Sequence, residues 1–294
     1  MSNGFLLVDK EAGFTSHDVV ALARKKFNTK KIGHAGTLDP MATGLLVLGV
    51  GIGTKLINFI VEGRKGYEAT IRLGSSTSTD DKEGDILETF ETSHISEQEI
   101  IDVLNKSKGI ISQRPSSVSA IKIEGKRAYE RVREGEIVEI PAREVEIYKL
   151  DILSIEKSKE FIDISIMVQC SAGTYIRSIA RDLGEALNSG GHLIKLNRNE
   201  VAPFFLSEAK KLAQAELISI KSGLEKILPS RTLSIEEERE IHFGRPISKS
   251  ENEITAAYLP DGEFASLLTN KEQSGKILSF PSLVNVKEIG RAHV

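Results

Sequence analysis

Between Gly33 and Leu46 the chain reads Gly-His-Ala-Gly-Thr-Leu-Asp-Pro-Met-Ala-Thr-Gly-Leu-Leu. The glycines, the aspartate and the proline of its first half favour turns, so we predict a loop over residues 33–40 and a buried strand over Leu45–Val50. Pro40 biases Asp39 towards extended backbone, which can point its carboxylate out of the loop into a cleft. For an Asp-Pro pair without further context, an aspartate that caps a turn is the commoner explanation.

The patterns on both sides of this segment predict an α+β fold. Strands and helices are mixed along the chain without a regular βαβ repeat, which favours α+β over a doubly wound parallel sheet. We expect a mixed, largely antiparallel central sheet flanked by helices and loops. The expected strands are residues 5–8, 45–50, 67–73, 145–155 and 161–170, and the expected helices are 15–27, 54–61, 96–104, 127–134 and 174–187, with a polar loop over 75–85.

The 294 residues fit one large domain with an appendage. We expect a catalytic domain over residues 1–230 and a small β-rich lobe over 233–287, where a helix at 235–243 precedes short strands at 254–259, 264–268 and 276–280. The last seven residues, 288–294, read Glu-Ile-Gly-Arg-Ala-His-Val and look like a translated sequencing adapter, so we interpret them as a non-native tail and expect the native C-terminus to be truncated.

Composition excludes several classes of protein. The single cysteine, Cys170, excludes an internal disulfide framework. The longest aliphatic run, Leu45–Val50, is far too short to span a membrane, and the N-terminus lacks the order of a signal peptide. We therefore expect a cytoplasmic protein.

Basic residues cluster in two segments although the formal net charge is −3. Residues 24–65 contain eight lysines and arginines against two acidic residues, and residues 106–133 contain eight against two. Together they could form one positive face for a nucleic acid, although a solvated helix surface explains the clusters equally well.

Several blocks of the chain, in the right order, resemble the TruB family of tRNA pseudouridine synthases. The loop quoted above is similar to the family's active-site motif, and the resemblance covers roughly residues 4–230. Glu11 stands where the family usually has proline, and Asn197 where a basic residue is common. Besides the loop, the matching blocks are residues 7–16, 66–69, 114–129, 170–178 and 193–198.

This resemblance implies an isomerase that converts uridine to pseudouridine at position 55 in the T loop of tRNA. It assigns the catalytic carboxylate to Asp39, stacking and proton removal to Tyr67, and an ion pair with Asp39 to Arg177. A guanidinium beside a carboxylate favours its ionised form and fixes its rotamer. The expected substrate-binding residues are His34, Tyr175, Lys10, Lys122 and Arg127.

The resemblance also sets expectations about partners and cofactors. The reaction needs no redox step and no phosphoryl transfer, so we expect neither cofactor nor metal. The target nucleotide must be extruded into a pocket, and stacking on a tyrosine offsets part of that free energy. We expect a monomer that binds the T arm of tRNA without a guide RNA or a membrane, and a C-terminal lobe that is PUA-like and binds RNA.

Two other functions use the same scaffold. A non-catalytic RNA-binding protein or tRNA-folding chaperone would lack the carboxylate and its partners, whereas Asp39, Tyr67 and Arg177 are all present. A synthase that works inside a guide-RNA complex usually carries long extensions, which this chain lacks. The glycine-rich residues 49–55 lack the spacing of a P-loop or of a dinucleotide-binding motif.

Overall fold

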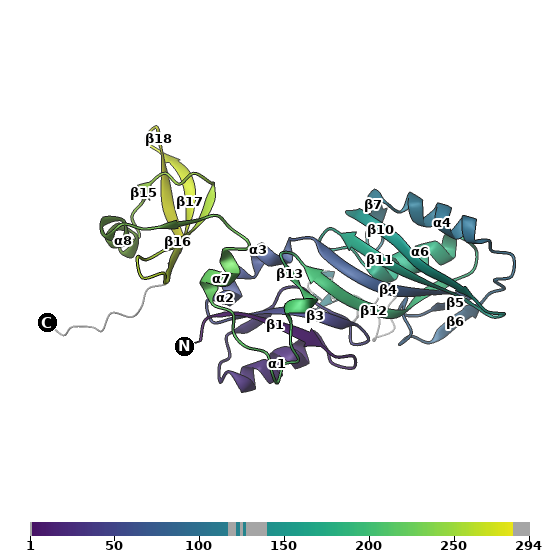
Figure 1. The fold of residues 1–294 in the computed structure, drawn as a ribbon. Helices are drawn as coiled ribbons and strands as arrows, with labels where there is room; N and C mark the ends of the chain where they lie inside the picture. The colour runs from purple at the N-terminus through teal and green to yellow at the C-terminus, as the bar shows by residue number, and fades with distance from the viewer. Residues whose placement is uncertain (1, 117–121, 124–125, 128–139, 285–294) are drawn as a thin grey trace.

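The computed structural model describes residues 2–116, 122–123, 126–127 and 140–284. Within these residues a nine-stranded sheet forms the body, and all its pairings are antiparallel except that of β3 with β12 (Figure 1). In spatial order its strands are β1 (Gly4–Lys10), β3 (Thr43–Val50), β12 (Gly191–Val201), β4 (Lys65–Leu73), β11 (Ile162–Cys170), β10 (Arg143–Lys157) and β7 (Gly109–Gln113), with β2 (Ile32–His34) on β3 and β13 (Phe204–Phe205) on β12. The predicted α+β class is confirmed.

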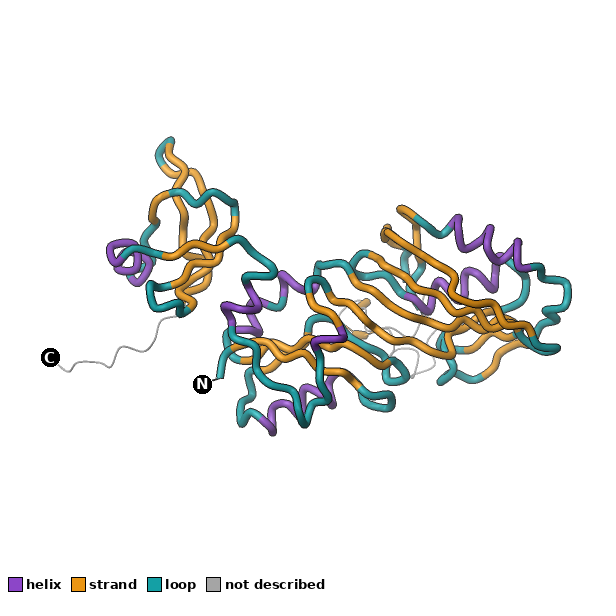
Figure 2. The backbone as a smooth tube through the Cα atoms, in the orientation of Figure 1, coloured by secondary structure: helices purple, strands orange, loops and turns teal. Residues whose placement is uncertain are grey.

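Short helices and hairpins surround the body sheet (Figure 2). They are α1 (Ser16–Lys26), α2 (Gly53–Leu56), α3 (Asn58–Val61), α4 (Glu97–Lys106), α6 (Ile176–Ala186), α7 (Ile220–Leu224), the 3-10 helix η1 (Leu206–Glu208), and the strand pairs β5 (Ser75–Thr77) with β6 (Ile86–Thr89) and β8 (Lys122–Ile123) with β9 (Lys126–Arg127). Capping boxes begin α1 and α4, because Thr15 and Ser96 each exchange hydrogen bonds with the acidic residue three positions on.

The structure confirms most predicted elements and corrects some. The long strands β10 and β11 pair as expected. The single helix expected over 54–61 is wrong, since α2 and α3 are separate, and His34 belongs to strand β2 rather than to the loop. The predicted loop over 75–85 begins with β5. Of the helix predicted over 127–134, Arg127 lies in β9 and the remaining residues lie outside the described part of the chain.

Strands β1 and β3 are buried on both faces, which explains their nearly uninterrupted apolar sequence. Leu6 and Val8 enter one hydrophobic cluster, under α1, α4 and α6, whereas Phe5 and Leu7 enter a second cluster with α2 and α7. A strand buried on both faces has no polar alternation, so its sequence shows a short apolar run.

The C-terminal lobe is a separate five-stranded sheet that shares a hydrophobic cluster with the body. Its strands, in spatial order, are β14 (Ser230–Thr232), β16 (Ile254–Tyr258), β17 (Phe264–Gln273), β18 (Lys276–Val284) and β15 (Ile247–Ser248), and its helix is α8 (Ile235–His242). Tyr258 and Phe264 of the lobe pack in the same cluster as Leu56 and Ile220 of the body. The domain boundary and the PUA-like character of the lobe stay predictions.

No helix among the described residues is long and apolar enough to cross a membrane.

Gly44 permits the one parallel pairing of the body sheet. It lies opposite Lys10 on β1 and Arg198 on β12, so these three residues form a row across the sheet. Its φ is +101°, and a Cβ atom built on it would lie 2.3 Å from the Arg198 carbonyl oxygen and 2.8 Å from the Arg198 nitrogen. Only glycine fits, because both atoms belong to backbone that cannot move aside.

We predict that Gly44→Ala lowers the free energy of unfolding by more than about 3 kcal/mol, since backbone strain and overlap add together. Gly109→Ala is the matched control: its φ is +85° but nothing lies within 4 Å of the added Cβ. In the control only the backbone strain lowers the free energy of unfolding, by about 1–2 kcal/mol. Urea unfolding of both variants measures the difference, and equal losses would contradict the close approach at Gly44.

Candidate active site

The loop that carries Asp39 is held at both ends by backbone and hydroxyl contacts. Buried Ser16, at the start of α1, accepts a hydrogen bond from the Leu38 nitrogen (2.8 Å) and donates one to the Leu38 carbonyl oxygen (3.2 Å). The Gly13 nitrogen donates to the Pro40 carbonyl oxygen at 2.9 Å. Leu38 and Pro40, directly before and after Asp39, are therefore both fixed. Leu38 is bound to the first residue of α1, and Pro40 is bound to Gly13, three residues before that helix.

Arg198 fixes the preceding part of the same loop. Its side chain is 1% exposed and donates to three carbonyl oxygens: Leu45 at 2.9 Å, Thr37 at 3.2 Å and Gly36 at 3.1 Å. Loop carbonyls removed from water need such donors. Sequence analysis placed residue 198 in a family-like block but gave its side chain no role.

Lys10 holds the other end of the loop, which does not fit the substrate-binding role predicted for it. It is 1% exposed, and its Nζ donates to the carbonyl oxygens of Phe14 (2.6 Å), Glu11 (2.9 Å) and Pro40 (3.3 Å). Burial lowers the pKa of Lys10 to about 8, and the nearby Asp39 carboxylate opposes this shift. A lysine enclosed in this way supports the loop from inside and cannot reach a phosphate on the surface.

Asp39 forms a two-pronged ion pair with Arg177, which comes from α6 in the other half of the body. Arg177 Nε lies 3.0 Å from Asp39 Oδ2, and Nη2 donates to Oδ1 at 3.2 Å. The arginine side chain is 5% exposed, whereas the aspartate side chain is 31% exposed. The carboxylate is thus anchored from the protein side and keeps an open side towards solvent.

A second carboxylate shares the same guanidinium. Asp81 Oδ2 lies 3.5 Å from Arg177 Nη1, and its side chain is 5% exposed. The Thr79 carbonyl oxygen accepts from Nη1 at 2.8 Å, and Ser116 Oγ lies 3.4 Å away. The sequence pattern indicated only a polar loop here, because nothing in residues 75–85 shows that the turn folds inward onto α6.

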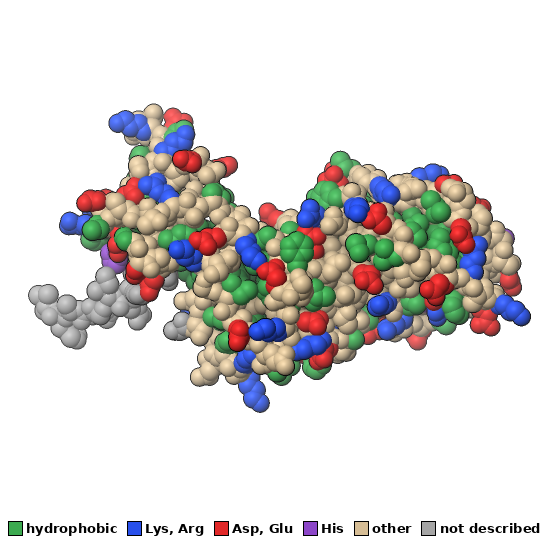
Figure 3. Space-filling view, in the orientation of Figure 1, with side chains coloured by type: hydrophobic (Ala, Val, Ile, Leu, Met, Phe, Trp, Pro, Cys, Tyr) green, Lys and Arg blue, Asp and Glu red, His purple; other side chains and the backbone are tan. Residues whose placement is uncertain are grey.

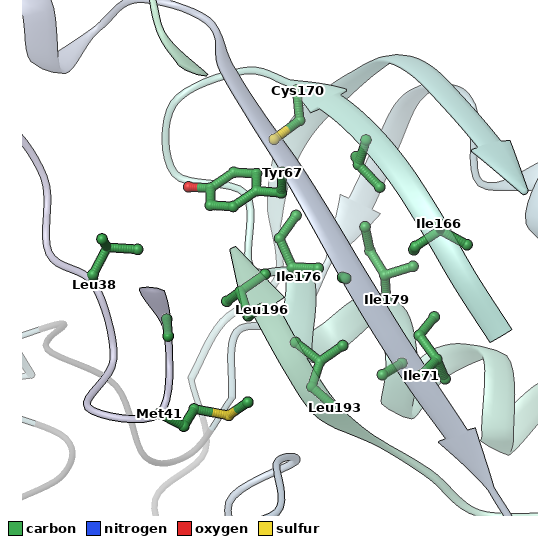
Figure 4. Packing of buried hydrophobic residues seen from close by; sticks show 14 of the residues in the cluster. Leu38, Met41, Tyr67, Ile71, Ile166, Cys170, Ile176, Ile179, Leu193 and Leu196 are labelled. Carbon is green, nitrogen blue, oxygen red and sulfur yellow. The ribbon is translucent and has the colours of Figure 1, made fainter. Parts of the chain in front are cut away.

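Tyr67 lies among buried apolar side chains. Figure 4 shows its ring next to Cys170 and Ile176, with the hydroxyl pointing towards the side on which Leu38 lies. The side chain is buried among residues of the main hydrophobic cluster. Burial raises the pKa of Tyr67, and the adjacent Arg198, which also hydrogen-bonds the phenol, partly counteracts this shift. Tyr67 and Arg198 are register partners on β4 and β12.

Tyr175 precedes α6 and is held by residues of β7, the edge strand, and of its neighbour β10. Its nitrogen donates to Gln113 Oε1 at 2.8 Å, and Gln113 Nε2 donates to its carbonyl oxygen at 3.1 Å. The Arg143 guanidinium lies 5.2 Å from the centre of its ring. Gln113 and Arg143 are register partners on β7 and β10, and sequence analysis assigned a role to neither.

Three predicted binding residues remain: His34, Lys122 and Arg127. The His34 ring, on β2, meets the His17 ring edge-on at 5.5 Å between centroids. Lys122 and Arg127 pair with each other on β8 and β9, and their side chains lie outside the described part of the structure. Their contact with substrate stays a prediction.

The first basic segment, residues 24–65, keeps its basic side chains exposed except for Lys65, but several of them are bound to backbone carbonyl groups. Arg24 donates to the Ile32 carbonyl oxygen, Lys26 to three carbonyl oxygens beyond residue 211, and the buried Lys65 to Val61 and Gly63. On the face shown in Figure 3, positive and negative side chains alternate. The predicted positive face is therefore not on this side of the molecule.

No group of three or more histidine, cysteine, aspartate or glutamate side chains within the described ranges is arranged to hold a metal ion.

Comparisons with known proteins agree on one family. Residues 24–176 match the TruB family pseudouridylate synthase (N terminal domain). A protein of Corynebacterium efficiens named tRNA pseudouridine synthase B is 45% identical over 284 residues, which cover 95% of each chain. A protein of the same name from Corynebacterium diphtheriae is 47% identical and covers 94% of each chain.

Solved structures share the fold. A chain in "Structure of H/ACA RNP bound to a substrate RNA containing 2'-deoxyuridine" superposes with a TM-score of 0.69 at 21% identity, covering 97% of this chain and 85% of that chain. A chain of a Cbf5-Nop10-Gar1 complex gives 0.68 at 23% identity, covering 96% and 84%. At this identity the likeness describes the fold alone.

We predict that the stability contributed by Lys10 increases between pH 8 and about pH 10. In the unfolded chain Lys10 keeps its proton up to its ordinary pKa of 10.5, whereas the folded protein releases it near 8. The unfolded state therefore binds more protons in this window, so the free energy of unfolding rises with pH. Urea unfolding at pH 7.5 and 9.5 should show wild type gaining stability relative to Lys10→Met. Lys25→Met, on the exposed face of α1, is the control, and a pH-independent difference for Lys10→Met would refute the shift.

Proposed function

This chain belongs to the TruB family of pseudouridine synthases, and we propose that it isomerises the uridine at position 55 in the T loop of tRNA with Asp39 as the catalytic carboxylate. The observation that carries the proposal is the two-pronged contact between Asp39 and the buried Arg177. It leaves one side of the carboxylate open, on a loop fixed at both ends. The names of the relatives support tRNA as the substrate.

The reaction exchanges one bond to the sugar for another. The bond between the ribose C1′ and the uracil N1 breaks, the base turns, and a bond forms between C1′ and C5. The hydrogen on C5 then leaves as a proton, and N1 gains one, so no external reactant is consumed. Asp39 starts the reaction in one of two ways: as a nucleophile on C1′, or as a base that removes the proton on C2′.

Two tyrosines contact the extruded nucleotide. Tyr67 stacks on the uracil and relays the proton from C5, releasing its own hydroxyl proton to solvent as it accepts the new one, and Tyr175 lines the opposite side of the base. Stacking contributes about 1–3 kcal/mol per base, which offsets much of the free energy of extrusion. His34 enters the T-loop region and helps hold the extruded nucleotide.

Binding of the remaining tRNA rests on shape and phosphate contacts. Lys122 and Arg127 contact the backbone of the T arm, and the C-terminal lobe acts as a PUA-like RNA-binding module that extends the contact. We propose that the chain does this as a cytoplasmic monomer, without guide RNA, cofactor or metal ion. Pseudouridine formation by the purified chain on a tRNA transcript, with a chelator present, tests whether a guide RNA, a cofactor or a metal ion is needed.

We predict that Asp39→Asn abolishes pseudouridine formation, a loss of at least about a thousandfold, while tRNA binding persists. The amide keeps the shape of the carboxylate but loses both charge and basicity. Carbodiimide mapping of an unmodified tRNA transcript measures the product, and filter binding measures the affinity. Asp151→Asn, which alters a solvent-exposed ion pair with Lys149 on β10, is the control. Wild-type turnover in Asp39→Asn would remove this residue from the mechanism and leave an RNA-binding protein on the same scaffold.

We also predict that Tyr67→Phe lowers turnover by about 10²–10⁴-fold, the usual contribution of a positioned acid or base, with little change in tRNA affinity. Phenylalanine keeps the stacking surface and removes only the hydroxyl. Single-turnover kinetics on a tRNA labelled at C5 follow loss of the C5 hydrogen directly. Tyr148→Phe, an exposed tyrosine on β10, serves as the matched control. Unchanged turnover would limit Tyr67 to stacking.

A further inference from the structure

We propose that Asp80 and Arg181 form an outer ion pair that positions Arg177 against Asp39. The inference rests on the proposed function, because it concerns how the same site is held in place. Arg181 Nη1 lies 3.4 Å from Asp80 Oδ2, and the two side chains are 14% and 15% exposed. Neither residue belongs to the catalytic set, and both act through the turn at residues 79–81.

The two arginines share one face of α6. Arg177 and Arg181 are four residues apart, so their side chains leave the helix in the same direction. Arg177 reaches Thr79 and Asp81, whereas Arg181 reaches Asp80 between them. The turn at residues 79–81 therefore contacts two guanidinium groups. Arg177 makes the inner contact, and Arg181 makes the outer one.

The backbone at Asp80 needs such support. Its φ is +59°, in the left-handed region, which is unfavourable for a residue with a Cβ by about 1–2 kcal/mol. The turn is also tied to β12, because the Leu193 nitrogen donates to the Asp80 carbonyl oxygen at 3.0 Å. The ion pair with Arg181 adds a side-chain tether at the same strained residue.

The conformation of this turn determines what Arg177 meets. Thr79 presents its carbonyl oxygen and Asp81 its carboxylate to Nη1, which leaves Nε and Nη2 for Asp39. If Asp80 relaxed to negative φ, the residues on either side of it would turn away from α6. Arg177 would then lose the contacts that fix its rotamer, and Asp39 would lose a rigid partner.

Arg181 connects a third segment to the same turn. Its Nη2 donates to the Arg114 carbonyl oxygen at 2.7 Å. Two residues later, Ser116 Oγ lies 3.4 Å from Arg177 Nη1. Arg181 thus connects residues 79–81 with residues 114–116, the two segments that supply partners to Arg177. It also contacts Asp182 on its own helix, at 2.6 Å, which provides a control.

A double-mutant cycle tests the pair. Asp80→Asn keeps a residue that tolerates positive φ, and Arg181→Gln keeps a polar chain, so both remove charge with little change in shape. We expect each to lower the single-turnover rate constant by roughly tenfold, within the range for residues of one network, without changing the Kd for tRNA. The double variant should lose no more than the worse single variant, and Asp182→Asn should react like wild type.

Three results would overturn the proposal: multiplicative losses in the double variant, an equal loss in Asp182→Asn, or a weaker Kd at an unchanged rate constant. A weaker Kd at an unchanged rate constant would make Arg181 a phosphate contact instead of a positioning residue. Amide hydrogen exchange of residues 77–85 gives a readout independent of activity, and we expect faster exchange in Asp80→Asn and Arg181→Gln. If the wild-type chain forms no pseudouridine, the proposed function fails, yet the exchange experiment still decides whether the pair holds the turn.

Discussion

The buried guanidinium of Arg198 is the constraint on which the rest of the site depends. The loop over residues 36–40 is partly buried, and the buried Arg198 side chain reaches its carbonyl groups from the protein side. Arg198 supplies donors to Gly36, Thr37 and Leu45, and a hydrogen bond from a charged donor contributes about 1.5–3 kcal/mol. Without this side chain the carbonyl oxygens of Gly36, Thr37 and Leu45 would lose their charged donor, so the position of the loop follows from that of β12.

The same strand pairings fix the loop and the aromatic platform relative to each other. Lys10, Gly44, Arg198 and Tyr67 follow one another across β1, β3, β12 and β4 as register partners. Lys10 and Arg198 hold the loop, Gly44 allows the strands to approach each other, and Tyr67 carries the aromatic ring. A site built on neighbouring strands of one sheet is held more rigidly than a site built on loops alone. The absence of a side chain at Gly44 therefore matters as much as the charges beside it.

The sequence identified the chemistry of the site better than its supports. Asp39, Tyr67 and Arg177 could be singled out because each lies in a family-like block, and the pairing of β10 with β11 followed from their apolar alternation. Lys10 was expected to bind substrate, whereas its carbonyl partners 30 and 4 residues away are a property of the fold that the sequence does not show. Asp81 and Gln113 could not be found either, since their partners on or next to α6 lie far along the chain.

The charges around Arg177 explain how the Asp39 side chain can be held in place and still react in the proposed mechanism. Its guanidinium lies between two carboxylates, Asp39 and Asp81, so the trio carries a formal charge of −1. Asp81 and Arg177 are nearly fully buried, and the excess negative charge faces outward through the more exposed Asp39. In the proposed reaction positive charge develops on the ribose as the glycosidic bond breaks, as in other reactions at an anomeric carbon. A carboxylate already held in place stabilises that charge without having to reorganise first. The second aspartate therefore serves the reaction by keeping the arginine fixed without neutralising the group that faces the substrate.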